Sequence, residues 1–219
     1  MSVPEDGEVQ ETGSVPENGT APLWVQTLTV TTADQTHALG AALAEVLRAG
    51  DLLVLTGELG AGKTTFTQGL GEGLGVREGI ISPTFVLVRI HPNLPDGPRP
   101  GGPDLVHVDA YRLGSASEID DIDLENTMDS SVTVVEWGHE RVEHLSDSRL
   151  EVELHRTRGG AGGPAAAEPA APATQASVLD FDTDDDDEPR TVVIRGFGPR
   201  WSEPPALPET MPQTPERNS

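Results

Sequence analysis

The sequence has no cysteine among its 219 residues, which excludes disulfide bonds, thiolate metal ligands and cysteine nucleophiles. Aromatic residues make up 4% of the chain and hydrophobic residues 35%, which is low for a protein that folds over its whole length. No window holds the roughly 18 uninterrupted apolar residues that a membrane span needs. The first ten residues, MSVPEDGEVQ, have neither the basic start nor the apolar core of a secretory signal. We therefore expect a soluble cytoplasmic protein that does not associate with membranes.

Basic residues are also scarce. Fourteen Lys and Arg stand against 37 Asp and Glu, so the formal net charge is −23. This balance argues against a broad basic face that grips nucleic-acid phosphates. Lys63 is the single lysine of the chain.

The acidic excess is concentrated in segments of low complexity. Residues 1–23 carry five acidic side chains and no basic one, and residues 159–189 carry eight and no basic one. The second segment is a Gly/Ala/Pro tract followed by an acidic run. Such compositions bury too little apolar surface to offset the entropy of ordering. We expect a disordered acidic tail over 1–23, a low-complexity acidic insert over 159–189 and a disordered Pro-rich tail over 202–219. A solvated linker is the favoured interpretation of the insert, ahead of a docking or regulatory role.

Residues 24–158 and 190–201 alternate strand and helix signals, which predicts one α/β domain with a mostly parallel central sheet. Thr32 and Gln35 have the spacing of a capping box, so a helix should begin there and end by Gly50. A second helix is expected over Lys63–Gly73, and a weak one over Ser115–Met128. Strands are expected at these positions: Trp24–Thr31, Leu52–Thr56, Thr84–Ile90, Asp104–Asp109, Val132–Glu136, Arg149–His155 and Thr191–Ile194.

The most specific motif is GELGAGKT at residues 57–64, which satisfies G-x-x-x-x-G-K-[ST] at every fixed position. A buried strand precedes it and a helix follows it, as a P-loop requires. The glycines let successive N–H groups point at a phosphate, Lys63 can reach the β- and γ-phosphates, and the Thr64 hydroxyl can bind Mg²⁺. The motif predicts a P-loop NTPase-like three-layer fold.

Two strands end in acidic residues that are candidates for the magnesium side of such a site. Asp109 ends DLVHVD as a Walker B acid would, and Glu136 ends VTVVE. Ligands of open α/β sheets lie at the carboxyl ends of strands, so both acids can face one nucleotide. One carboxylate would hold the metal and the other would orient the attacking water. Which of the two residues has which role stays open.

Other residues carry weaker signals. Ser82 and Thr84 follow the P-loop helix where nucleotide-sensing segments occur, although an ordinary turn explains them equally well. His107 is expected to be a satisfied core histidine. Trp137 is either an aromatic residue at the edge of the site that contacts a partner, or a core residue. Arg112 either orients a phosphate or pairs with an acidic side chain.

The class of nucleotide follows from an exclusion. Guanine-specific GTPases read their base with an Asn/Thr-Lys-x-Asp element, and the single lysine already lies in the P-loop. ATP is therefore the expected nucleotide. A small-molecule kinase and a non-catalytic nucleotide-gated interaction module remain alternatives to an ATPase.

Four motifs, taken in order, resemble the TsaE family, the small bacterial ATPases of tRNA threonylcarbamoyladenosine synthesis. They are GELGAGKTT (57–65), SPTF (82–85), VHVDAYRL (106–113) and TVVEWG (133–138). The resemblance covers about residues 28–155, and RTVVIRGFGPRW (190–201) is similar to the family's closing strand. The acidic tail, the Pro/Gly-rich loop at 91–103 and the insert go beyond a compact family member.

The resemblance implies ATP bound with Mg²⁺. It places the nucleotide on Gly57 and on Gly60, Ala61, Gly62, Lys63, Thr64 and Thr65, with the base near residues 32–34. By this resemblance, Lys63, Asp109 and Glu136 would be the catalytic residues. The Mg²⁺ ligands would be Thr64, Asp109 and Glu136. Arg190 is a candidate phosphate contact. The implied partners are TsaD and TsaB, with tRNA reached only through that complex. Hydrolysis is expected to be slow alone and stimulated by partners, because the sequence shows no evident arginine finger.

Overall fold

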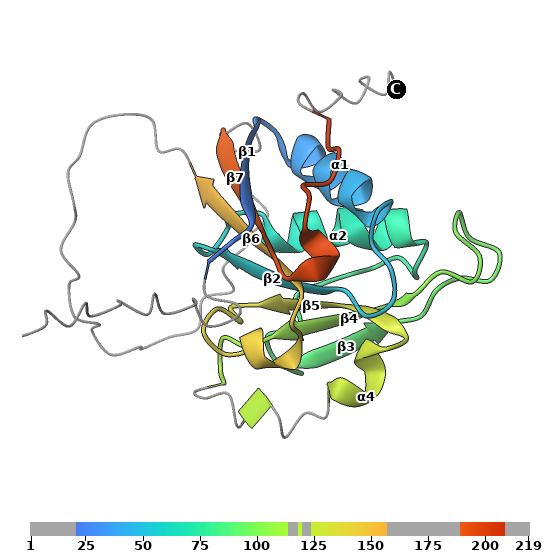
Figure 1. Ribbon diagram of the computed structural model, residues 1–219. Helices are drawn as coiled ribbons and strands as arrows, with labels where there is room; N and C mark the ends of the chain where they lie inside the picture. The colour runs from blue at the N-terminus through green and yellow to red at the C-terminus, as the bar shows by residue number, and fades with distance from the viewer. Residues whose placement is uncertain (1–20, 114–117, 120–123, 157–188, 209–219) are drawn as a thin grey trace, which may run out of the picture.

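The computed structural model describes residues 21–113, 118–119, 124–156 and 189–208. Its centre is a seven-stranded sheet with the order β1-β7-β6-β2-β5-β4-β3 (Figure 1). The strands are β1 (Trp24–Val30), β2 (Leu52–Gly57), β3 (Val88–His91), β4 (Asp104–Asp109), β5 (Ser131–Glu136), β6 (Arg149–Arg156) and β7 (Arg190–Phe197). The central strands β6, β2, β5 and β4 pair in parallel, and β1, β7 and β3 add antiparallel edges. The predicted mostly parallel central sheet is confirmed.

Helical elements cover both faces of the sheet. The helices α1 (Ala33–Ala44) and α2 (Lys63–Leu74) pack together on one face, and the short elements α4 (Glu125–Met128) and η1 (Glu143–Leu145) lie on the other (Figure 1). A further 3₁₀ turn, η2 (Pro199–Trp201), follows β7. These layers confirm the predicted three-layer α/β fold.

Strand β2 shows why the core forms on two sides. Leu53 and Leu55 join the cluster beneath α1 and α2, whereas Leu52 and Val54 join the cluster on the opposite face. All four side chains are fully buried. A continuous apolar run is what a central parallel strand needs, because helices cover both of its faces.

The first helix begins as the capping box predicts. The Thr32 hydroxyl accepts a hydrogen bond from the Gln35 N–H at 3.1 Å, and the Gln35 side chain accepts one from the Thr31 N–H at 2.8 Å. The helix ends at Ala44, well before Gly50. The second helix ends at Leu74, where Gly75 adopts the left-handed conformation.

The strand predicted over Thr84–Ile90 is wrong in its first half. Residues 84–86 form a turn in which the Pro83 carbonyl accepts from the N–H groups of Val86 and Leu87. Leu87 has φ +67°, which no strand residue adopts. Only Val88–His91 pairs with β4, and the turn directs Thr84 toward Asp109 instead.

Several expectations concern segments that the structure covers only in part. Of the helix expected over Ser115–Met128, the structure describes only residues 118–119 and the segment from residue 124 onward, which contains α4. Most of the predicted acidic tail and insert, and the C-terminal tail beyond residue 208, lie outside the described residues. The predicted C-terminal tail begins at residue 202; most of residues 202–208 are exposed, but Leu207 is 8% exposed and belongs to the main core.

Candidate nucleotide-binding site

The P-loop joins the carboxyl end of β2 to the start of α2, in the middle of the sheet. Gly60 and Gly62 have φ values of +75° and +98°, which side chains other than glycine rarely adopt. A Cβ at Gly57 would also lie 2.5 Å from the Leu154 carbonyl oxygen of the neighbouring strand. Glycine is therefore required at these turns, which bring the loop backbone to the amino end of α2.

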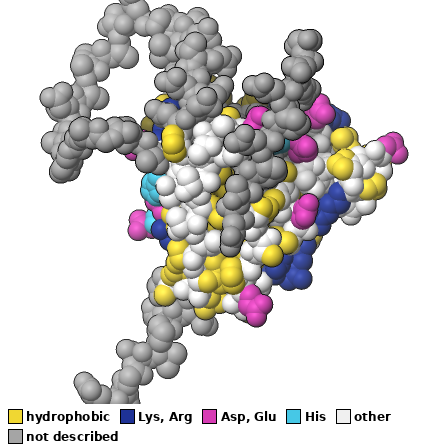
Figure 2. Space-filling view, turned by 90° about the horizontal axis from the view of Figure 1, so that it is seen from above, with side chains coloured by type: hydrophobic (Ala, Val, Ile, Leu, Met, Phe, Trp, Pro, Cys, Tyr) yellow, Lys and Arg dark blue, Asp and Glu magenta, His cyan; other side chains and the backbone are white. Residues whose placement is uncertain are grey.

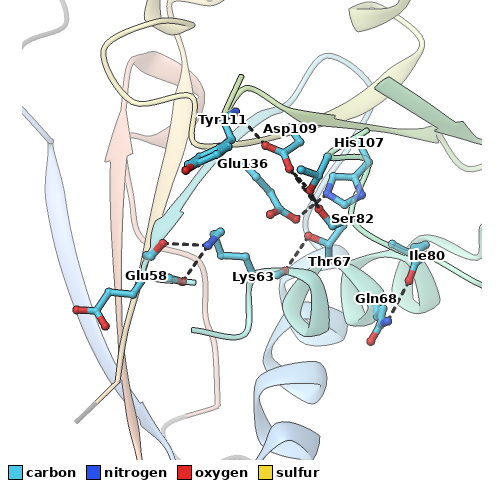
Figure 3. Close-up of polar contacts among 12 residues, drawn as sticks. Glu58, Lys63, Thr67, Gln68, Ile80, Ser82, His107, Asp109, Tyr111 and Glu136 are labelled. Carbon is cyan, nitrogen blue, oxygen red and sulfur yellow. Dashed lines mark hydrogen bonds and ion pairs between the residues drawn. The ribbon is translucent and has the colours of Figure 1, made fainter. Parts of the chain in front are cut away.

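Lys63, the first residue of α2, is 6% exposed. Its ammonium donates to the carbonyls of Gly57 at 2.9 Å and Glu58 at 3.1 Å (Figure 3). It also lies 4.1 Å from the centre of the Trp137 ring, a cation–π arrangement. Burial lowers the pKa of Lys63 from its ordinary value, and the negative charges of Glu136 and Asp109 partly oppose that shift.

Asp109 lies at the end of β4 and is 3% exposed. Its Oδ2 accepts hydrogen bonds from the hydroxyls of Thr84 at 2.6 Å and Ser82 at 3.3 Å, and its Oδ1 accepts from the Tyr111 N–H at 2.9 Å. Figure 3 shows the side chains of Asp109 and Ser82 beside that of Glu136. The segment that carries Ser82 and Thr84 is thus attached to the candidate Walker B acid.

Glu136 ends β5 directly beside Asp109, since the two residues are register partners. Its Oε1 lies 2.8 Å from Nε2 of His107, and both side chains are buried. The sequence predicted a satisfied core histidine at this position. His107 is indeed buried, and its partner is the candidate catalytic carboxylate.

Trp137 follows Glu136 in a left-handed conformation with φ +61°, which is uncommon for a large side chain. Its N–H donates to the Leu55 carbonyl at 2.9 Å, which holds the backbone in place. The ring contacts Tyr111 edge-on, with 5.4 Å between centroids. The ring therefore lies at the cavity, over Lys63, rather than in the core.

These residues surround one cavity of about 570 Å³, within the roughly 300–1,000 Å³ of small-molecule sites. Most of the predicted site residues line it: Gly60, Ala61, Gly62, Lys63, Thr64, Thr65, Asp109 and Glu136. Gly57 lies outside the described lining and contributes its carbonyl to Lys63. The hydroxyl of Thr64 and the carboxylates of Asp109 and Glu136 are hard oxygen donors of the kind that Mg²⁺ takes, so this donor set fits the ion.

Two residues named from the family resemblance line the cavity: Ala33, within the segment 32–34 expected near the base, and the candidate phosphate contact Arg190. Arg156 lines it as well. Arg112 lies outside the described lining, with its guanidinium 5.0 Å from the centre of the Phe85 ring. Arg156 had no sequence signal, because only its position beside the P-loop distinguishes it from other strand-end arginines.

Comparison with known proteins identifies the family. The family model described as threonylcarbamoyl adenosine biosynthesis protein TsaE matches residues 30–161, more than half of the chain. The chain belongs to the TsaE family. This confirms the resemblance drawn from the four motifs.

Individual TsaE proteins match most of the folded region. The tRNA threonylcarbamoyladenosine biosynthesis protein TsaE of Streptomyces coelicolor is 48% identical over 165 residues, covering 75% of this chain and 92% of the relative. The Bacillus subtilis protein of the same name is 39% identical over 124 residues, 56% of this chain and 73% of the relative. A structure titled "Crystal structure of Bacillus subtilus YdiB" has a TM-score of 0.52 at 27% identity, over 80% of this chain and 87% of that one.

Proposed function

We propose that this chain binds ATP with Mg²⁺ and hydrolyses it in support of the threonylcarbamoyl transfer that modifies the adenosine beside the anticodon of tRNA. One observation carries the ATPase part. The sole lysine of the chain lies at the start of the P-loop helix, in the same cavity as the two buried carboxylates Asp109 and Glu136. The names of the two TsaE relatives, both tRNA threonylcarbamoyladenosine biosynthesis proteins, support the tRNA part.

The roles of the site residues follow from their chemistry. The loop N–H groups and Lys63 would bind the β- and γ-phosphates, and Thr64, Asp109 and Glu136 would hold Mg²⁺. When bound, Mg²⁺ neutralises charge that develops on the phosphates. Asp109 and Glu136 are fixed by their partners Thr84 and His107, so the two carboxylates would need little rearrangement to act.

We further propose that the ATPase works in the cytoplasm with the protein partners TsaD and TsaB, and reaches tRNA only through them. Membership of the TsaE family and the net charge of −23 support this arrangement. On the face that Figure 2 presents, basic side chains gather at the lower right and lie singly at other edges, among acidic and apolar ones. No helix among the described residues is long and apolar enough to cross a bilayer.

The decisive experiment measures phosphate release from ATP by the full chain, alone and with TsaD and TsaB, beside the variant Lys63→Ala. We expect release to depend on Mg²⁺, to rise with the partners and to be lost in the variant. Unchanged turnover in Lys63→Ala would refute the assignment. Transfer of phosphate to a small acceptor would indicate a kinase instead. Tight ATP binding without any release, even with both partners, would indicate a nucleotide-gated interaction module.

A further inference from the structure

A histidine and two glutamates come together away from the nucleotide cavity. His139 lies in the loop between β5 and η1, Glu143 begins η1, and Glu151 lies within β6. One donor atom from each of the three side chains lies within 4.8 Å of those of the other two. None of the three residues is part of the described lining of the nucleotide cavity. The fold thus forms a second cluster of side chains that can bind a metal ion.

The spacing of the donor atoms is close to that of ligands on one metal ion. Zn²⁺ binds imidazole nitrogen and carboxylate oxygen at about 2.0–2.2 Å, so at tetrahedral angles two ligand atoms lie about 3.4 Å apart. Nδ1 of His139 and Oε1 of Glu143 are 3.6 Å apart. The side chain of His139 is 58% exposed, so its ring can turn toward an ion. Only a small movement is needed for the three side chains to share one ion.

Both carboxylates of the cluster are held in place by hydrogen bonds. Oε1 of Glu143 accepts from the Glu140 N–H at 2.6 Å, and Oε2 accepts from the Val142 N–H at 3.0 Å. Oε1 of Glu151 accepts from Nε of Arg149 at 3.0 Å. Hydrogen bonds of this kind orient the ligands of metal sites and contribute to their affinity.

The burial of Glu151 is the strongest reason to expect a cation. The residue is 8% exposed, and glutamate is rarely so buried unless its charge is paired. Among the residues that the structure describes, Arg149 is its hydrogen-bonding partner and takes Oε1, which leaves Oε2 available to a further ligand. Arg149 can offset only one of the two carboxylate charges of Glu143 and Glu151. A bound cation would offset the other.

The types of donor indicate the class of ion. The imidazole of His139 suits Zn²⁺ and its neighbours Ni²⁺ and Cu²⁺, whereas Mg²⁺ and Ca²⁺ take oxygen ligands. The chain has no cysteine, so no thiolate competes with the cluster for such an ion. The exposed ring of His139 gives the ion a path from solvent to the buried Glu151.

We propose that His139, Glu143 and Glu151 form a Zn²⁺-binding site, with a fourth position of the ion left to water. The site is independent of the proposed ATP site, which uses other residues and Mg²⁺. A bound ion would connect the loop after β5 to β6. Trp137 begins that loop with its ring over Lys63, so zinc would also fix the backbone beside the nucleotide cavity.

The test titrates ZnCl₂ by calorimetry into the full chain after removal of metal with a chelator. The buffer holds Mg²⁺ in excess, which should not displace zinc from a site that contains an imidazole. We expect one Zn²⁺ to bind per chain. His139→Ala, Glu143→Gln and Glu151→Gln should each weaken zinc binding by about tenfold or more, which is the smallest effect usual for groups that merely support a metal ligand.

His144→Ala is the matched control, because His144 follows Glu143 in η1 and lies outside the cluster. This substitution should leave zinc binding unchanged. Asp109→Ala tests the oxygen donors of the nucleotide cavity as another zinc site, and it should also have no effect. If Glu151→Gln does not fold, as judged by thermal unfolding, the variants at the exposed His139 and the half-buried Glu143 decide the question.

Three results would overturn the zinc site. One is the absence of zinc binding by the unaltered chain. Another is equal zinc affinity in the unaltered chain and His139→Ala, because binding would then involve acidic side chains elsewhere. The third is zinc binding that is lost in Asp109→Ala and kept in His139→Ala, which would assign the ion to the nucleotide cavity. Each of these leaves the proposed ATPase to be judged by phosphate release in Lys63→Ala.

Discussion

His107 and Glu136 form a buried pair in which Nε2 lies 2.8 Å from Oε1, with side chains that are 0% and 3% exposed. His107 belongs to β4, two residues before Asp109, and Glu136 ends the neighbouring strand β5. A histidine that bonds one oxygen of a carboxylate fixes the direction of the other, as partners of metal-binding groups commonly do. The pair connects the core of the sheet to the magnesium side of the candidate site.

We expect His107→Ala to lower kcat of ATP hydrolysis by about 10–100-fold, the usual effect of removing such a partner. The Mg²⁺ concentration for half-maximal activity should rise, while KM for ATP changes little. His107→Gln, whose amide can still donate to Glu136, should recover part of the activity. His37→Ala is the control, because His37 pairs with Glu72 outside the cavity lining. An equal effect of both alanine substitutions would assign His107 to folding alone.

We expect the hydroxyl of Thr84 to support ATP hydrolysis through its hydrogen bond to Asp109. It donates to Oδ2 of Asp109 at 2.6 Å, and Thr84→Val removes that donor while keeping the shape of the side chain. Without this bond the Asp109 carboxylate is less well fixed. We expect kcat to fall by roughly tenfold, because a tenfold change corresponds to about the free energy that one hydrogen bond to a charged group contributes. Thr84→Ser should retain most of the activity. If valine and serine variants hydrolyse ATP equally well, the hydrogen bond has no catalytic role.

Burial of Lys63 predicts a pH-dependent stability. Its pKa is lowered in the folded chain, chiefly by desolvation, so the unfolded chain binds more protons between the folded pKa and the ordinary value of 10.5. Lysine therefore destabilises the nucleotide-free fold at neutral pH, and this effect disappears as pH rises toward 10.5. Lys63→Met should unfold at the same or a higher denaturant concentration than the unaltered chain at pH 7, and the difference should shrink at alkaline pH. A variant that is less stable at pH 7 would contradict this.

The parts of the site that the sequence predicted are those carried by consecutive residues. A buried apolar strand, a glycine turn and a helix start define the P-loop, and hydrophobic strands that end in acid define Asp109 and Glu136. Phe85 misled the strand prediction, because a short apolar run rich in aromatic and β-branched residues indicates a strand, yet Phe85 is 84% exposed on a turn. Arg156 could not be predicted, because its place beside Gly60 depends on β6 pairing with β2 and on register.

The contact between α1 and α2 predicts a sharp stability effect at Gly69. A Cβ there would overlap the His37 carbonyl oxygen, and it would lie 3.1 Å from the Ala41 nitrogen. Both neighbours are backbone atoms of α1 and cannot rotate away, so the helices would have to separate. Alanine normally favours a helix over glycine by about 0.5–1 kcal/mol, whereas such overpacking costs about 1–3 kcal/mol.

Gly69→Ala should therefore lower the free energy of unfolding by about 1–2 kcal/mol, measured by urea denaturation. Glu72→Ala, at an exposed position of the same helix, should change it by less than about 0.5 kcal/mol. Because α2 begins at Lys63 and α1 begins beside the cavity at Ala33, separating the helices should also weaken ATP binding. Gly69→Ala with unchanged stability would mean that the two helices are not held at the distance described here.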